Sequence, residues 1–252
     1  MKNIKTEGIK KDPGIFTDML MVFVCCIFLS ACAGNVQQKY SQRNLKSTTQ
    51  SVIARAATDE EKLERLFLFV RDEIDFNWVY PQDIPPEEVL KNGFGVCMQK
   101  ANLLSAMAKE AGFQTRFRFM FVHKQALEDF LPDYAYKNWA DPFPHTVVEI
   151  VYQGEWRSFD PSFDGKLQKI CLDNKINFAR YPEIASAYKT KFSIEGMKGT
   201  QEFWNIAGSK PFYGDTLEPL IDWDQKNVSF FKKRLKPLIF WQAKGIMDKF
   251  RK

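Results

Sequence analysis

The 252-residue chain contains one cysteine whose surroundings suit covalent chemistry. Cys97 follows Gly93-Phe94-Gly95-Val96, and the two glycines permit backbone angles and close contacts that larger residues do not. From Cys97 onward, apolar residues recur at helical spacing until Gly112, which predicts a helix with Cys97 in its first turn. The free N–H groups and the dipole of a helix N-terminus stabilise a thiolate, so this position favours a nucleophilic thiol.

His145 and Asp160 are the partners that such a thiol needs. A turn at Gln153-Gly154 joins the strands expected before and after it, and it places Asp160 opposite Val147. His145 is then a diagonal neighbour of Asp160 on the same face, about 7–8 Å away at the backbone and within side-chain reach. A cysteine, a histidine and an aspartate in this arrangement supply a nucleophile, a general base and its orienting group. The strands expected around the site are 115–122, 145–152 and 156–160.

Two sets of motifs occur in this order along the chain. The first set is Gly95-Val96-Cys97, Ala101, Leu104, Ala106, Ala111-Gly112-Phe113 and Thr115-Arg116, and the second is His145, Glu149-Ile150-Val151, Gly154, Trp156 and Phe159-Asp160-Pro161-Ser162. Together they resemble the transglutaminase-like superfamily over residues 57–164. The resemblance implies a papain-like α+β fold, in which a helix bearing the cysteine packs on an antiparallel sheet carrying the histidine and the aspartate. It also implies thiol attack on an amide or ester carbonyl, giving an acyl-enzyme that water or an amine resolves.

The rest of the predicted site is less determined. The backbone N–H of Cys97 would donate to an oxyanion, and members of the family often complete the oxyanion hole with a residue upstream of the cysteine. Trp78, Tyr80 and Gln82 are all candidates for that role. The long aromatic segment 124–144 is predicted to be a lid that covers the substrate.

Each site residue also has a structural alternative. Cys97 could be a buried thiol or form a disulfide with Cys171, which is otherwise expected to be an apolar core residue. His145 could be an ordinary strand histidine, and Asp160 before a proline is a common turn residue. The remaining histidine and two further acids are predicted to lie on the surface or in solvated loops: His123, Asp141 and Asp164. With two histidines and no zinc-type cysteine spacing, we expect no metal and no cofactor.

The N-terminus is predicted to be an export signal. A basic start precedes the apolar run Met19 to Leu29, which is shorter than the roughly 20 residues of a membrane-spanning helix. Leu29-Ser30-Ala31-Cys32 then resembles a bacterial lipobox, which implies cleavage before Cys32 and lipid attachment to its sulfur. Ala33 follows instead of an acid, which favours the outer membrane, facing the periplasm.

The predicted organisation has four parts. These are a lipoprotein signal (1–31), a flexible tether (32–56), a transglutaminase-like domain (57–226) and a basic tail (227–252). The tail holds six Lys and two Arg against Asp248, a net charge of +7 within a chain of net +5. Its apolar residues recur at helical spacing, so it could pack on its own domain, which we prefer, or lie on an anionic membrane.

The sequence therefore predicts a lipid-anchored thiol enzyme of the bacterial cell envelope. Its substrates would be peptide or protein amides, and hydrolysis is preferred to amine transfer because a water-accessible envelope provides no assured amine acceptor. The expected contacts are this substrate and the membrane, through Cys32 and, in the second alternative for the tail, through its basic residues. Nucleic acid is not an expected partner. The alternative is a catalytically inactive binding module of the same fold, or a structural lipoprotein.

Overall fold

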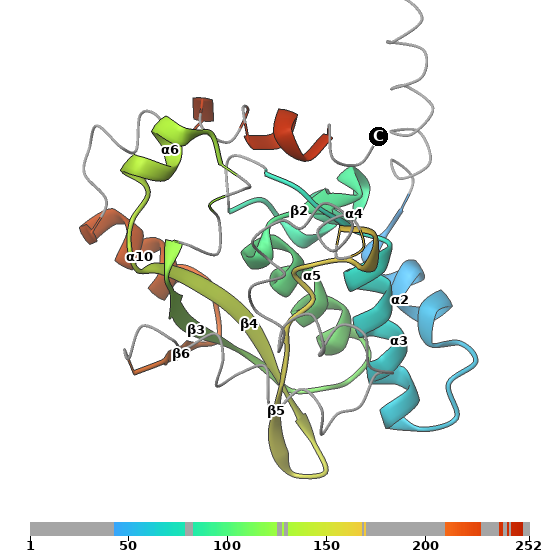
Figure 1. Cartoon of the computed structure of the whole chain (residues 1–252). Coiled ribbons are helices and arrows are strands. Elements are labelled where there is room, and N and C mark those ends of the chain that lie inside the picture. Colours follow the sequence, from blue (N-terminus) through green and yellow to red (C-terminus); the bar gives the residue numbers. More distant parts are fainter. Residues whose placement is uncertain are drawn as a thin grey trace, which may run out of the picture. The chain divides into compact units, whose positions relative to one another are not determined.

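The computed structural model describes residues 43–78, 83–124, 128, 131–167, 169, 210–227, 237, 238, 241 and 243–248. Helices are combined with a four-stranded antiparallel sheet, which confirms the α+β class (Figure 1). No helix in these ranges is long and apolar enough to cross a membrane. In chain order the elements are α2 (Leu45–Ile53), α3 (Asp59–Asp72), β1 (Asp75–Phe76), α4 (Pro86–Asn92), β2 (Phe94–Gly95), α5 (Cys97–Glu110), β3 (Thr115–Val122), α6 (Asp133–Asn138), β4 (Phe143–Tyr152), β5 (Glu155–Phe159), β6 (Phe212–Gly214) and α10 (Glu218–Asn227).

The sheet has the strand order β5-β4-β3-β6. β3 has the predicted bounds, and β4 begins two residues earlier than predicted. Gln153 and Gly154 both have positive φ angles, of 52° and 78°, as a two-residue hairpin turn matched to the strand twist requires. The turn pairs Val148 with Phe159, which is the register predicted from the sequence.

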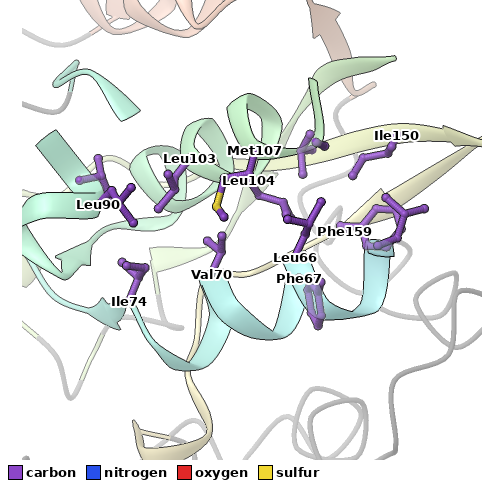
Figure 2. Packing of buried hydrophobic residues seen from close by; sticks show 14 of the residues in the cluster. Leu66, Phe67, Val70, Ile74, Leu90, Leu103, Leu104, Met107, Ile150 and Phe159 are labelled. Carbon is purple, nitrogen blue, oxygen red and sulfur yellow. The ribbon is translucent and has the colours of Figure 1, made fainter. Parts of the chain in front are cut away.

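The main core lies between α3, α5 and one face of the sheet. Apolar residues of α3 such as Leu66 and Val70 face Leu104 and Met107 of α5 (Figure 2). Each of these four side chains is fully buried. Ile150 and Phe159 extend the same cluster to β4 and β5, so the core fixes the Cys97-bearing helix against the sheet.

Strand β3 departs from the half-buried pattern expected of it. Its first half alternates between buried and partly buried residues, but its second half is buried on both faces. Met120 and Val122 on the second face are covered by a second cluster, which we call the Trp78 cluster. The Trp78 cluster consists of Phe76, Trp78, Val96, Met120, Val122, Leu131, Ala135, Val147, Phe163, Leu167, Ala243 and Met247.

The tether predicted over residues 32–56 is wrong in its second half, because α2 lies there. Asn44 caps this helix by accepting a hydrogen bond from the backbone N–H of Ser47 at 3.2 Å. Thr49 is buried, and Leu45 and Val52 pack against the main core. These apolar residues are too few to be noticed in a polar stretch, but their helical spacing brings them to one side. Residues 32–42 lie outside the described part of the chain.

The segment 124–144, predicted to be a lid, contains the short helix α6. Trp139 after that helix meets Trp78 edge to face, with the ring centroids 5.6 Å apart. Asp141 near the end of the segment accepts a hydrogen bond from the backbone N–H of Lys124 at its start, at 3.1 Å. The segment is therefore anchored at both ends, and its action as a lid stays a prediction.

The described part of the basic tail packs on the domain, which is the alternative preferred from the sequence. Residues 243–248 are helical, and Ala243 and Met247 are fully buried in the Trp78 cluster. Asp248 accepts a hydrogen bond of 2.9 Å from the side-chain amide of Asn77, 171 positions earlier in the sequence. In contrast, the tail residue Trp241 leaves 70% of its surface exposed.

Candidate active site

Cys97 is the first residue of α5, where the sequence predicts it. Val96 before it is extended, and its backbone N–H donates to Oε1 of Gln99 at 2.9 Å. A Cβ atom at Gly95 would lie 3.0 Å from the Cβ of Gln99 and 3.1 Å from its Oε1, so any larger residue here would crowd Gln99. The thiol of Cys97 is free and partly buried. The glycine in the approach to the helix thus lets Gln99 fold back and hold the turn that presents Cys97.

His145 and Asp160 form a buried pair. Nε2 of His145 lies 2.8 Å from Oδ2 of Asp160, and 5% of each side chain is exposed. The contact follows from the β4–β5 register, because Asp160 comes directly after the Phe159 that pairs with Val148. The diagonal neighbourhood predicted from the hairpin turn is therefore present as a direct side-chain contact.

The charges around His145 favour its protonated form. Burial lowers the pKa of His145, but the charge of Asp160, the charge of Cys97 and hydrogen bonds to both raise it to about 10. Since Nε2 contacts Asp160, Nδ1 is the ring nitrogen left to face the thiol. Burial also raises the pKa of Asp160, yet the His145 charge and the hydrogen bonds from His145 and Ser162 lower it below its ordinary value of 3.8. The structure thus brings His145 and Asp160 into direct contact, with Cys97 near enough to the same imidazole to influence its pKa.

Ser162 fixes the second oxygen of the Asp160 carboxylate. The Ser162 backbone N–H donates to Oδ1 of Asp160 at 3.0 Å, and its hydroxyl donates to the same oxygen. Ser162 is fully buried. Sequence reasoning gave this residue no role, although an Asp followed two residues later by Ser is a known pattern for such a turn. With Oδ2 on His145 and Oδ1 on Ser162, the carboxylate cannot rotate without losing a contact.

Replacement of Ser162 by alanine is expected to lower the free energy of unfolding by about 1.5–3 kcal/mol, because a hydrogen bond to a charged group is lost. Urea denaturation at pH 7 measures this. With one donor fewer, the pKa of Asp160 rises towards 3.8, so stability is lost at a higher pH as the solution is acidified. An unchanged urea midpoint and acid limb would contradict the assigned contact.

The matched control for that variant is Ser158→Ala. The Ser158 hydroxyl is also buried and donates to a carboxylate, Oε1 of Glu149, at 3.0 Å. We expect a similar loss of stability at neutral pH. The rate at which iodoacetamide alkylates Cys97 should stay unchanged in the control and fall several-fold in the Ser162 variant, because Ser162 contacts Asp160 and Ser158 contacts Glu149 instead.

Of the three oxyanion-hole candidates, the structure describes one. Trp78 is buried in the Trp78 cluster with Val96, the residue before Cys97. Its backbone N–H donates to Oδ1 of Asn77 at 2.9 Å. Tyr80 and Gln82 lie outside the described residues. The structure therefore places Trp78 beside the approach to the thiol, and its action on an oxyanion stays a prediction.

The acids and histidine expected at the surface have different outcomes. His123 is exposed, as predicted, and its Nδ1 lies 3.1 Å from the exposed Asp141. Asp164 is not a solvated loop acid, because it is fully buried and accepts hydrogen bonds from two backbone N–H groups. The turn after Asp160 folds inward, and this could not be seen in the sequence. Within the described ranges, no three His, Cys, Asp or Glu side chains are grouped to hold a metal ion. Cys32 and Cys171 lie outside those ranges.

The chain is similar to known proteins over part of its length. A solved structure of a candidate cysteine protease from Cytophaga hutchinsonii is similar at 15% sequence identity and a TM-score of 0.36. The similarity covers 48% of this chain and 38% of that one, so this chain spans well under half of that protein. A search of curated proteins finds no match. Residues 46–161 match the family model of the transglutaminase-like superfamily, and this segment includes α2, Cys97, His145 and Asp160. This part of the chain is therefore similar to the transglutaminase-like superfamily.

Proposed function

We propose that the domain is a thiol enzyme that attacks the amide carbonyls of peptides or proteins. The observation that carries the proposal is the buried contact of 2.8 Å between His145 and Asp160, with Cys97 near enough to the same imidazole to raise the pKa of His145. A nucleophile, a base within hydrogen-bond reach and a third group that orients the base are the geometric signature of covalent catalysis.

The reaction would proceed in two steps. In the first, Sγ of Cys97 bonds to the carbonyl carbon, the C–N bond breaks, and Nδ1 of His145 gives its proton to the leaving amine. The backbone N–H of Cys97 donates to the oxyanion, with the Trp78 indole as the second candidate donor. In the second step, water adds to the thioester, His145 takes its proton, and the C–S bond breaks to release the acid. An amine in place of water would give acyl transfer.

Acylation of Cys97 would change the pKa of His145 in the direction that the second step needs. The free enzyme keeps the imidazole protonated partly because the charge of Cys97 raises the pKa of His145. In the acyl-enzyme that charge is gone, so the pKa of His145 falls while Asp160 still orients the ring. The imidazole then accepts a proton from water more readily. One side chain thus serves as acid in the first step and base in the second.

The test of this function is a library of peptide amides, analysed by intact mass. A productive substrate should leave an acyl group on the wild-type chain that maps to Cys97 and is absent from Cys97→Ala. Free acid as the product supports hydrolysis, and a new amide formed with an added amine supports transfer. A chain that acylates with no library member, under conditions in which iodoacetamide labels Cys97, would support the inactive binding module instead.

We further propose that the protein is a lipoprotein of the outer membrane that faces the periplasm. The support is the lipobox-like Leu29-Ser30-Ala31-Cys32 after a short apolar run. A single acyl chain gives weak attachment unless a second signal is present. The tail, with its net charge of +7, can provide that signal.

The two sides of the tail support both alternatives raised by its sequence. Ala243 and Met247 are buried, whereas Leu238 and Trp241 leave 46% and 70% of their surfaces exposed. Ala243 and Met247 therefore face the domain, whereas Leu238 and Trp241 face solvent. One side would hold the tail on the domain, and the other would present a tryptophan and a leucine to an anionic membrane, among basic residues.

Fluorescence of the full chain in vesicles tests the membrane contact. With phosphatidylcholine vesicles containing anionic phosphatidylglycerol, brominated lipid should quench a component of tryptophan emission that disappears in Trp241→Phe. The control is Trp156→Phe, which changes a tryptophan of β5 that leaves 40% of its surface exposed. This variant should keep the quenching. Equal quenching in Trp241→Phe and wild type would rule the contact out, whatever the N-terminus contributes.

A further inference from the structure

Asp164 is a fully buried carboxylate outside the set formed by Cys97, His145 and Asp160. Its Oδ2 accepts a hydrogen bond from the backbone N–H of Phe76 at 2.8 Å, and its Oδ1 accepts one from Leu167 at 2.9 Å. Burial of a carboxylate is costly unless hydrogen bonds compensate for the lost water. A neutral residue would avoid that cost. The segments that donate these two hydrogen bonds therefore indicate what the carboxylate of Asp164 holds together.

The first bond reaches the strand that leads to Trp78. Phe76 is the last residue of β1, which runs parallel to β2 and pairs Phe76 with Gly95. The next residue, Asn77, donates its backbone N–H to the Gly95 carbonyl at 3.1 Å. One short ladder therefore joins the approach to Trp78 with the approach to Cys97.

The second bond lies within the turn that follows Asp160. Leu167 N–H and the Asp164 carboxylate close this turn on itself, four residues beyond Asp160. The Phe163 ring also packs on the Phe76 ring, with the centroids 4.8 Å apart. The carboxylate thus fastens the segment that carries Asp160 to the ladder described above.

Three segments that are far apart in the sequence meet at this carboxylate or at its partner strand. They lead to Trp78, to Cys97 and to Asp160. The His145–Asp160 contact is made without Asp164, because it depends on the β4–β5 register and on Ser162. What Asp164 holds, together with the Phe163–Phe76 ring contact, is the placement of the Trp78 strand, and with it the Cys97 approach, relative to the Asp160 turn.

We propose that Asp164 is a positioning residue of the thiol site, which sets the oxyanion side of the site against the side that carries the acid and base. The inference rests on the proposed function. The proposal predicts different effects of Asp164 on two reactions of the Cys97 thiol. Attack of the thiol on an alkyl halide needs the thiol and imidazole only, whereas attack on a carbonyl also needs the oxyanion donors in place.

The test compares these two reactions in Asp164→Asn. An amide of the same shape can accept from only one of the two N–H groups, and its NH₂ group faces the other. We expect acylation by p-nitrophenyl acetate, measured as the initial burst of p-nitrophenol, to slow 10- to 100-fold at 15 °C. Alkylation of Cys97 by iodoacetamide should stay within about threefold of wild type. Equal slowing of both reactions, or of neither, would reduce Asp164 to a structural role.

A matched control and a second variant keep the test decisive. The control is Asp72→Asn. Asp72 accepts a hydrogen bond of 3.2 Å from the backbone N–H of Gly165 in the same turn, but this bond does not involve β1. Both rates should therefore stay at wild-type values. Phe163→Leu weakens the same link through packing and should slow the burst more than the alkylation, even if the Asp164 variant fails to fold. Unchanged burst kinetics in folded Phe163→Leu would overturn the proposal. A wild-type chain that is alkylated but never acylated would instead refute the proposed function.

Discussion

Replacement of Cys97 by alanine is expected to abolish the fast iodoacetamide labelling of the chain and to lower acylation by p-nitrophenyl acetate by at least about 10³-fold. The reason is that alanine has no atom that can bond to the carbonyl carbon, while the oxyanion donors and the pocket remain. Cys97 lies at the start of α5 and is partly buried, so loss of one sulfur atom should leave the fold intact. Stopped-flow measurement of p-nitrophenol release and intact mass of the product provide the two readouts.

The control for this experiment is Cys171→Ala, which removes the other thiol of the predicted mature domain. Both rates should match wild type, and non-reducing mass analysis of the wild-type chain should find Cys97 unpaired. Labelling of Cys97 at the rate of an ordinary exposed thiol would contradict an activated nucleophile. A disulfide between Cys97 and Cys171 would contradict the catalytic role as a whole.

The second large effect is expected from Asp160→Asn, which should lower carbonyl acylation by about 10³- to 10⁴-fold at pH 7. Burial lowers the pKa of His145, and without Asp160 only the contributions of Cys97 remain to raise it. The asparagine NH₂ group would also donate to Nε2, which leaves the ring proton on Nδ1, where the thiol needs an acceptor. The burst rate and the alkylation rate, each followed from pH 5 to 10, measure these losses.

The pH dependence of stability gives an independent readout of the same pair. Since the pKa of His145 is raised from 6.5 to about 10, its share of the stability is complete below pH 6.5 and is lost as the pH rises through 10. Since the pKa of Asp160 is lowered from 3.8, its share is complete above that pH and is lost on further acidification. Asp160→Asn should flatten both limbs.

The molecule contains a matched pair for this variant. His123 and Asp141 also lie within 3.1 Å of each other, but both are exposed, and exposed ion pairs contribute little. Asp141→Asn should therefore leave the burst, the alkylation and the pH limbs as in wild type. If both aspartate variants behave alike, the effect at Asp160 is a general consequence of charge and not of its contact with His145.

Most of the site could be predicted because its contacts are local to the turns. Gln153-Gly154 forces a two-residue hairpin, and the register of the hairpin decides which side chain meets His145. The start of the helix at Cys97 follows in the same way from the glycines before it. In both places a residue type determines the backbone, and the backbone determines the contact.

The parts that could not be predicted depend on long-range packing. Asp164 is buried because β1 supplies an N–H from a position 88 residues earlier, and nothing near it in the sequence indicates this. Met120 and Val122 lie in a strand whose first half alternates normally, yet distant segments cover them. Helix α2 is polar apart from the few side chains that reach the core.

The contact between Asn77 and Asp248 has a consequence for how the protein is made. Ala243 and Met247 complete the hydrophobic cluster that surrounds Trp78, so this cluster stays open to water until the ribosome has synthesised these late residues. A nascent chain halted before them would carry the thiol, the imidazole and the carboxylate but not a closed wall beside them. Because a chain is synthesised from its N-terminus, the cluster around Trp78 is completed only after Met247 has been added.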